Sequence, residues 1–210
     1  MNNLFCKTKA QKFLLIIFLF FIGCTNSKPP EFQNGDLIFQ TSLSSQSEAL
    51  QLATGSRYSH MGIIYKNNGG YYVFEAIQPV QLTDLNKWIK RGKGGHFVVK
   101  RLKKSESLLT PEALRTMKRI GEKYAGKNYD LYFEWSDDRI YCSELVWKIY
   151  KQALNIEIGK LKKIKDFDLT HPVVKARIKE RYGNRLPENE PVISPGQMFN
   201  SNLLYTVYSN

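Results

Sequence analysis

The sequence predicts an α+β domain in which helices pack against a mostly antiparallel sheet. Two apolar, strand-like runs, 60–65 and 71–77, are separated by Lys-Asn-Asn-Gly-Gly, which is typical of a hairpin turn. Two further segments, 110–126 and 141–153, carry apolar residues at helical spacing. The chain has 210 residues, 42% of them hydrophobic and 24% charged, so we expect one globular domain and exclude a disordered chain, collagen and a coiled coil.

The elements before residue 105 are predicted from turn residues and short apolar runs. Asn34-Gly35 forms a turn before a strand at 36–40. Residues 47–54 are expected to form a brief helix, with Ser47 as its N-cap and Gly55 as its stop. The hairpin follows, and residues 97–102 form a further strand.

The second half of the chain contains the two clearest helices. Thr110 is a good N-cap and Pro111 suits the first turn, and Gly126 ends this helix. The helix at 141–153 has an apolar stripe made of Leu145, Val146, Ile149 and Ala153. Residues 155–200 show no regular pattern, and 203–208 is expected to be a closing strand.

The N-terminal segment has the pattern of an export signal. Three lysines precede Phe13–Ile22, an apolar run of 10 residues, whereas a membrane-spanning helix needs about 20. Such a run suits a secretory signal, and Gly23-Cys24 resembles the lipobox of bacterial lipoproteins. We therefore expect a signal peptide at 1–23, lipidation at Cys24 and a polar tether at 24–33. A plain signal peptide or an uncleaved anchor is the alternative.

The positive charge indicates an anionic surface. Removal of residues 1–23 takes away three lysines and lowers the formal net charge from +12 to +9. Between Lys87 and Lys104 the chain has eight basic residues, with Trp88 and Phe97 among them. These form either a solvated surface or a contact with anionic lipid headgroups. Because the chain is expected at the bacterial cell envelope as a membrane-anchored lipoprotein, nucleic acid is not an expected partner.

The scarce cysteines single out Cys142. Cys6 is lost with the signal and Cys24 is used for lipid, so Cys142 is the one remaining thiol and cannot form an internal disulfide. It lies at the expected start of a helix, where unpaired N–H groups and the helix dipole favour a thiolate and can hold an oxyanion. The alternative is a buried core thiol, because Cys142 shares the apolar side of this helix.

The hairpin brings a histidine and a carboxylate together. If Asn68-Gly69 forms a two-residue turn, His60 and Glu75 are diagonal neighbours on one face of the hairpin. A turn shifted by one residue places them directly opposite, whereas a loop of odd length separates them. A carboxylate beside an imidazole orients it and stabilises its charged form, which suits a base acting on a thiol. Otherwise His60 only begins a strand and Glu75 is solvated.

Four blocks of sequence, in this order, resemble the YiiX-like branch of the NlpC/P60 superfamily, which contains circularly permuted papain-like cysteine peptidases and amidases. The blocks are Asn34-Gly-Asp-Leu-Ile-Phe39, Ser59-His-Met-Gly-Ile-Ile-Tyr65, Val73-Phe-Glu-Ala76 and Tyr141-Cys-Ser-Glu-Leu-Val146. The permutation accounts for the order His, Glu, Cys.

The resemblance implies a role for each site residue. Cys142 is the nucleophile, His60 the general base and Glu75 the residue that orients the base. Tyr141 and Asp36 occupy family positions and are expected to contact substrate, with a turn residue as the alternative for Asp36. The resemblance implies a permuted papain-like domain at 34–208, which needs no cofactor.

These observations predict a cell-envelope thiol hydrolase or acyltransferase that forms an acyl-enzyme on an amide or ester, whether in a peptide or an acyl lipid. The alternative is a lipid-anchored binding protein with the same fold and no activity. A zinc ion held by Cys142, His60 and Glu75 is a third reading, but structural zinc sites usually carry Cys or His pairs at short spacing, which the sequence lacks. No metal is therefore expected.

Overall fold

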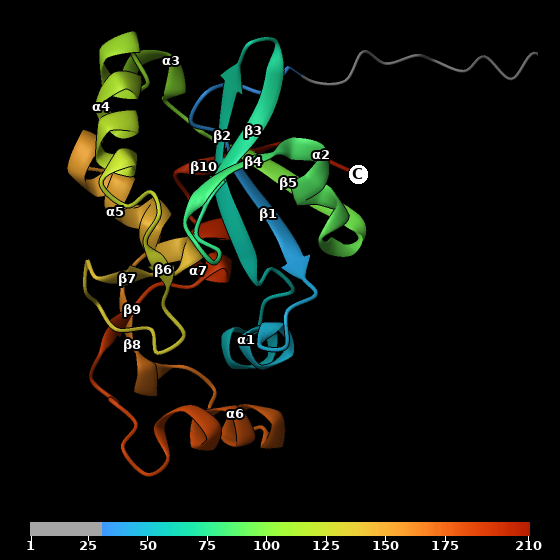
Figure 1. Ribbon diagram of the computed structural model, residues 1–210, viewed down its shortest axis with the longest axis vertical. Coiled ribbons are helices and arrows are strands. Elements are labelled where there is room, and N and C mark those ends of the chain that lie inside the picture. The colour runs from blue at the N-terminus through green and yellow to red at the C-terminus, as the bar shows by residue number, and fades with distance from the viewer. Residues whose placement is uncertain (1–30) are drawn as a thin grey trace, which may run out of the picture.

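The computed structural model describes residues 31–210, and its centre is a six-stranded antiparallel sheet (Figure 1). The strand order is β10-β5-β1-β2-β3-β4. The strands are β1 Leu37–Ser42, β2 His60–Asn67, β3 Gly70–Glu75, β4 Gln81–Asp84, β5 Gly92–Leu102 and β10 Leu204–Ser209. This architecture confirms the predicted α+β class.

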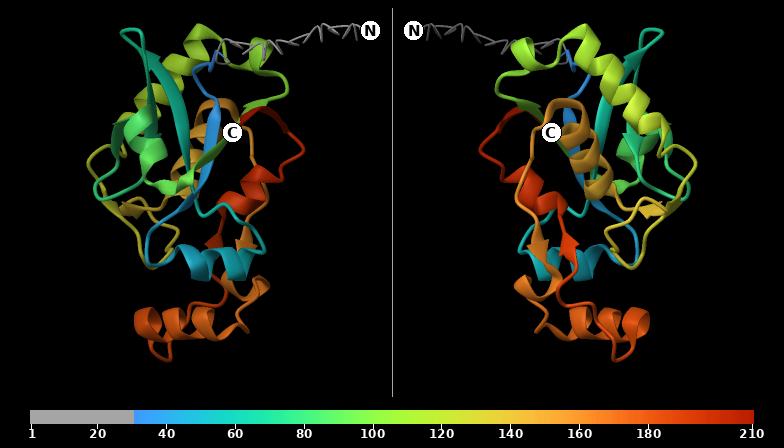
Figure 2. Two further views of the ribbon diagram at one scale, coloured as in Figure 1. Left: turned by 90° about the vertical axis from the view of Figure 1, so that its right-hand side faces the viewer. Right: turned by 90° about the vertical axis from the view of Figure 1, so that its left-hand side faces the viewer.

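Helices and short strand pairs surround the sheet, and α6 lies at one end of the molecule beside α1 (Figure 2). The helices are α1 Ser47–Thr54, α2 Leu85–Lys90, α3 Ser105–Leu108, α4 Pro111–Glu122, α5 Cys142–Leu154, α6 Pro172–Tyr182 and α7 Pro195–Phe199, with a 3-10 turn at Ile164–Asp166. The short strands are β6 Asn128–Tyr129, β7 Arg139–Ile140, β8 Lys162–Lys163 and β9 Pro191–Val192.

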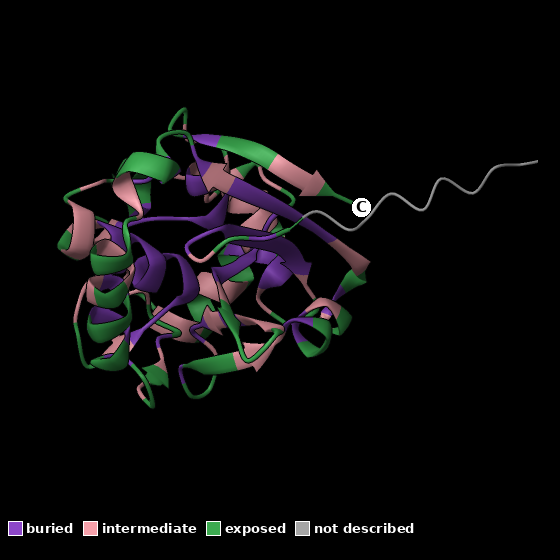
Figure 3. Cartoon of the chain, turned by 90° about the horizontal axis from the view of Figure 1, so that it is seen from above, coloured by how far each residue is buried: buried purple, intermediate pink, exposed green. Residues whose placement is uncertain are grey.

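The sheet is covered on both faces, which explains the unbroken apolar sequence of β1. Successive strand residues point to opposite faces, so Leu37 and Phe39 join the cluster beneath α5, whereas Ile38 packs with Trp88 of α2. All three β1 residues are fully buried. Figure 3 shows buried residues along the central strands and exposed residues on the outer faces of the helices.

The hairpin between β2 and β3 has the predicted two-residue turn. Asn67 pairs with Gly70, and Asn68 and Gly69 have φ values of 46° and 80°. Positive φ at both central positions defines a type I′ turn, whose twist matches that of the strands. The predicted register of β2 and β3 is therefore confirmed.

Three local predictions differ from the structure. Ser47 is not the N-cap of α1: Gln46 takes that position, because the Ser47 hydroxyl is 2.6 Å from that of Ser59 and does not cap the helix. The strand predicted at 97–102 begins at Gly92. The helix that Thr110 caps ends at Glu122, before Gly126.

The sequence patterns did not predict β4, α2 or α6. Helix α2 has only six residues, and its cap is Asp84, whose side chain accepts a hydrogen bond from the N–H of Lys87. Helix α6 has one buried residue, Val174, so it has no apolar stripe that a periodic pattern could indicate.

The packed part of the chain includes residue 32. Phe32 is buried, and its ring makes edge contacts with the rings of Tyr71, Phe97 and Tyr208. The predicted signal peptide, the lipidation site Cys24 and most of the predicted tether lie outside the described residues. Among residues 31–210, no helix combines the length and apolar character needed to cross a membrane.

Candidate active site

Cys142 is the first residue of α5, as the sequence predicts. The residue before it, Tyr141, is the N-cap, and its backbone N–H donates to Oε2 of Glu144 at 3.3 Å. This bond fixes the start of the helix, and the N–H groups of the first turn have no partner within a helix. Cys142 is 2% exposed. Its thiol therefore lies at a helix N-terminus and is largely shielded from water.

His60 and Glu75 meet across the hairpin. Nε2 of His60 lies 2.6 Å from Oε2 of Glu75, and the Glu75 side chain is fully buried. Arg91, the single residue between α2 and β5, holds the other oxygen of Glu75. The imidazole also stacks on the indole of Trp88, with ring centroids 5.9 Å apart. Its orientation is therefore fixed by an ion pair and by an aromatic plane.

His60 also interacts with the Cys142 side chain, so the structure brings the three predicted catalytic residues together. Burial disfavours the charged imidazole, but its interactions with Cys142 and Glu75 and the negative charge of both groups raise the pKa of His60 to about 9. For Glu75, burial disfavours the carboxylate, but the contact with His60 and the charge of Arg91 hold its pKa below the ordinary value. At neutral pH His60 is therefore an imidazolium in contact with the Glu75 carboxylate.

Two polar residues at the thiol have no local signal in the sequence. The Tyr129 hydroxyl, from β6, interacts with Cys142, and both residues line one groove. Nε2 of Gln46 donates to this hydroxyl at 3.0 Å. Burial raises the pKa of Tyr129 well above its ordinary value, so the phenol stays neutral and can donate. Neither residue lies in a periodic pattern, and the contact between them spans 83 residues of sequence.

The two residues expected to contact substrate have different surroundings. Tyr141 lies beside the thiol and borders an apolar groove, and its hydroxyl accepts a hydrogen bond from the N–H of Ile193 at 3.2 Å. Asp36 is buried in a two-bond ion pair with Arg101, at 2.7 and 2.8 Å, and also accepts from the N–H of Gln33. The structure therefore does not place Asp36 with the other candidates, and its carboxylate instead fixes the start of β1 to β5.

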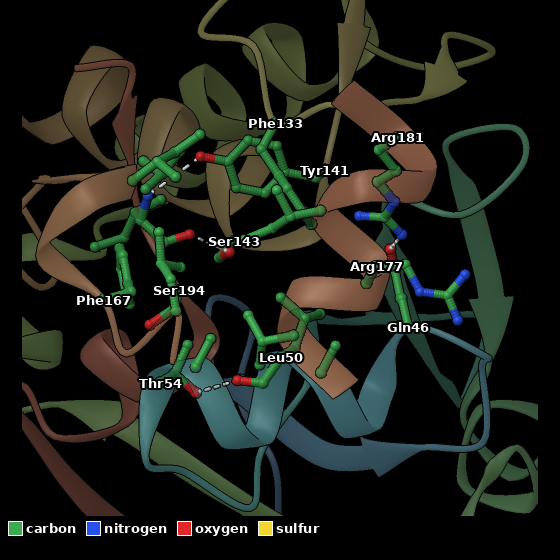
Figure 4. A pocket seen from close by; sticks show the side chains of 18 of the residues that line it. Gln46, Leu50, Thr54, Phe133, Tyr141, Ser143, Phe167, Arg177, Arg181 and Ser194 are labelled. Carbon is green, nitrogen blue, oxygen red and sulfur yellow. Dashed lines mark hydrogen bonds between the residues drawn. The ribbon is translucent and has the colours of Figure 1, made fainter. Parts of the chain in front are cut away.

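A groove that is open to solvent leads from Cys142 between α1 and α6 (Figure 4). Its lining is mostly apolar and includes Ala49, Leu50 and Ala53 of α1, Val174 and Ile178 of α6, and Phe167. A second, wider depression is lined in part by His60 and shares Gln46, Tyr129 and Arg181 with this groove. The candidate catalytic residues thus lie where an apolar channel meets a more polar opening.

Within residues 31–210, no group of three or more His, Cys, Asp or Glu side chains is arranged to hold a metal ion. Both oxygens of Glu75 have partners in the protein, because His60 holds one and Arg91 the other.

Comparison with known proteins agrees with this geometry. The family model described as permuted papain-like amidase enzyme, YaeF/YiiX, C92 family, matches residues 31–208. The chain is 48% identical over 175 residues to the uncharacterized protein YiiX of Escherichia coli strain K12, an alignment that covers 83% of this chain and 85% of that protein. It is 47% identical to the crystal structure of metalloprotein YiiX from Escherichia coli O157:H7, with a TM-score of 0.81 over 85% of this chain and 97% of that chain.

The family model covers nearly all of the described residues, and each of the two matches covers most of the length of the relative. The family is one of papain-like amidases, which supports a hydrolase of the cysteine peptidase type. The word metalloprotein in the description of the second relative applies to that protein. The chain belongs to the YaeF/YiiX family of permuted papain-like amidases.

Proposed function

We propose that the protein is a thiol hydrolase in which Cys142, His60 and Glu75 act as a catalytic triad on a carbonyl substrate. The observation that carries this proposal is the association of three side chains: Nε2 of His60 lies 2.6 Å from Oε2 of Glu75, the imidazole interacts with Cys142, and the pKa of His60 is raised to about 9. Such an arrangement supplies the nucleophile, the proton carrier and the orienting acid that covalent acyl transfer needs.

The geometry supports a two-step reaction. The Cys142 sulfur attacks the carbonyl carbon, and the carbonyl oxygen becomes an oxyanion facing the N–H groups of the first turn of α5. His60 gives its proton to the leaving amine or alcohol, and the carbon–heteroatom bond breaks to leave a thioester on Cys142. Water then loses a proton to His60 and attacks the thioester, which releases the acid and restores the thiol.

The shape of the groove favours a long apolar acyl group over a peptide. A peptide needs partners for its N–H and C=O groups, whereas the groove beside Cys142 is lined mostly by aliphatic and aromatic side chains. The proposed substrate is therefore an acyl amide or acyl ester whose chain lies between α1 and α6. The leaving group faces the wider depression beside His60.

A series of p-nitrophenyl esters and p-nitroanilides with acetyl, octanoyl and dodecanoyl chains tests this function. The wild-type protein is expected to prefer the longer chains, and Cys142→Ala to abolish turnover. Mass spectrometry should detect an acyl group on Cys142. Ala53→Phe, which narrows the groove, should shift the preference to acetyl, while Ala125→Phe at an exposed site should not. Absence of turnover and of any acyl adduct would instead favour the second candidate, a lipid-anchored binding protein with the same fold.

The proposed place of action is the cell envelope, with the membrane contacted through a lipid on Cys24. The N-terminal pattern supports this proposal, as do five exposed lysines of the basic stretch, Lys87, Lys90, Lys93, Lys103 and Lys104. Full-length protein expressed in bacteria is expected in the membrane fraction, and Cys24→Ala should lower that fraction. Cys6→Ala is the matched control, because it removes a cysteine within the signal and leaves the lipobox intact. Equal distribution of both variants would contradict lipidation at Cys24.

A further inference from the structure

We propose that Arg181 is a positioning residue that acts through Gln46 to fix the Tyr129 hydroxyl as a hydrogen-bond donor to the Cys142 sulfur. This inference rests on the proposed thiol chemistry and assigns it a residue from α6, outside the triad. It makes α6, a segment with no regular sequence pattern, part of the catalytic apparatus.

The three polar side chains form a continuous row that ends at the sulfur. Nη2 of Arg181 donates to Oε1 of Gln46 at 2.7 Å, a bond drawn in Figure 4. Nε2 of the same amide donates to the Tyr129 hydroxyl at 3.0 Å. The Tyr129 hydroxyl in turn interacts with Cys142, and both residues line the groove.

The direction of these bonds follows from what each group can do. A guanidinium only donates, so the oxygen of the Gln46 amide must face Arg181. The amide NH₂ then faces Tyr129, and the phenol oxygen accepts from it. The hydrogen of the phenol is left to point at the sulfur, where a thiolate is the best acceptor. Without Arg181 the amide can turn over, and the phenol hydrogen can point at the amide oxygen instead.

The row is held on a preformed framework. Gln46 is the N-cap of α1, and the Ser47 and Ser59 hydroxyls, 2.6 Å apart, tie this turn to the start of β2. The guanidinium of Arg181 lies over the Phe133 ring, 5.4 Å from its centroid. From the same helix, Arg177 donates to the carbonyl of Ser45 at 2.8 Å. Helix α6 therefore docks on the turn that carries Gln46 at two separate points.

The chemical consequence concerns the negative charge on sulfur. A charged donor at one end of a row of hydrogen bonds polarises the bonds that follow it. The Tyr129 hydroxyl is therefore a stronger and better oriented donor to the thiolate than a free phenol would be. Loss of Arg181 should make the thiolate less available without disturbing the ion pair of His60 and Glu75.

Alkylation of Cys142 by iodoacetamide measures this effect without requiring any substrate. We expect Arg181→Met to slow alkylation at pH 7 by about tenfold, below the effect of removing a direct donor from an oxyanion site, and to move its pH profile upward. Gln46→Met interrupts the row while leaving α6 in place and should act alike. Arg181→Lys, which keeps a donor, should recover part of the rate. Lys179→Met changes an exposed basic residue of the same helix, outside the row, and should keep the wild-type alkylation profile.

A double-mutant cycle distinguishes an effect passed along the Arg181–Gln46–Tyr129 row, called the relay below, from a general loosening of the site. Because Arg181 acts through Tyr129, Arg181→Met combined with Tyr129→Phe should alkylate no more slowly than Tyr129→Phe alone. Additive losses, or Arg181→Met and Gln46→Met proteins that alkylate like wild type, would overturn the proposal. Thermal unfolding of each variant shows whether it is folded. If Arg181→Met does not fold, Gln46→Met takes its place as the test of the proposal.

Failure of the relay and failure of the hydrolase proposal give different results. If the esters are cleaved and Cys142→Ala abolishes cleavage while Arg181→Met changes neither alkylation nor turnover, the hydrolase stands and the relay fails. If no ester or anilide is cleaved but alkylation depends on Arg181 and Gln46, the relay stands and the hydrolase fails.

Discussion

Glu75 lies 2.6 Å from His60, at the end of β3 beside the first residue of β2. The type I′ turn fixes the register of these strands, and this register brings the carboxylate to the imidazole. Since the turn is specified by two adjacent residues, the acid and the base of the site depend on very local sequence. This contact is also the easiest part of the site to test separately from the nucleophile.

Glu75→Gln should lower kcat roughly a hundredfold or more, because an amide cannot stabilise the imidazolium and can favour the wrong tautomer. The volume hardly changes, so the fold should persist. Turnover of the dodecanoyl ester measures the effect, with Glu48→Gln, an exposed residue of α1, as the control. Equal kcat in both variants would remove Glu75 from the triad.

The rate of acylation should fall as the pH rises through about 9, the raised pKa of His60. His60 must carry a proton for the leaving group, and above this pH the ring is neutral. The same rise in the pKa of His60, from its ordinary value of 6.5, also stabilises the folded protein. This stabilisation is fully present below about pH 6.5 and is lost as the pH rises through 9. The pH profile of kcat/KM is the measurement. In Glu75→Gln the alkaline limb should move to lower pH, and an unmoved limb would assign it to another group.

Arg91→Met should have a smaller effect, about five- to tenfold on kcat near neutral pH, on the scale of about 1 kcal/mol for an exposed charge. Arg91 is partly exposed and holds the oxygen of Glu75 that does not face His60. Its charge helps to keep the pKa of Glu75 low. A carboxyl with a lowered pKa keeps its charge as the pH falls, so loss of Arg91 should move the acid limb of the kcat profile to higher pH. Lys93→Met, an exposed change two residues away, should leave both limbs in place.

The three proposed catalytic residues could be brought together from the sequence because the position of each depends on local structure. His60 and Glu75 follow from a two-residue turn, and Cys142 follows from the start of an amphipathic helix. Gln46, Tyr129 and Arg181 could not be predicted in this way. They come from a helix cap, a two-residue strand and a helix without an apolar stripe, and the bond between Arg181 and Gln46 spans 135 residues of sequence.

Asp36 was singled out by the sequence, but the structure places it away from the site. It lies in one of the blocks that resemble the family, yet the structure places its carboxylate against Arg101, 65 residues away, rather than at the thiol. A carboxylate that begins a strand gives no local sign of the partner that will neutralise it. Only the pairing of β1 with β5 brings Arg101 to Asp36.

Gly62→Ala should destabilise the fold by about 1–3 kcal/mol, the usual cost of forcing extra atoms into a packed core. A Cβ at Gly62 would lie 2.5 Å from Cγ1 of Val73, 2.7 Å from the carbonyl oxygen of Phe74 and 3.3 Å from Cβ of Glu75. The backbone contact cannot be relieved by a side-chain rotation, so β3 must move away from β2. Because Glu75 lies on β3, this movement should also weaken its contact with His60.

Urea unfolding of Gly62→Ala should therefore show a lower midpoint, and kcat should fall in the protein that remains folded. Gly70→Ala is the matched control at the other end of the same hairpin, because a Cβ there meets its nearest atom, on the Tyr72 ring, at 3.4 Å. A Gly62→Ala protein with the stability and kcat of Gly70→Ala would show that the two strands can separate without disturbing the triad. The close approach of the strands at Gly62 would then not be what holds Glu75 against His60.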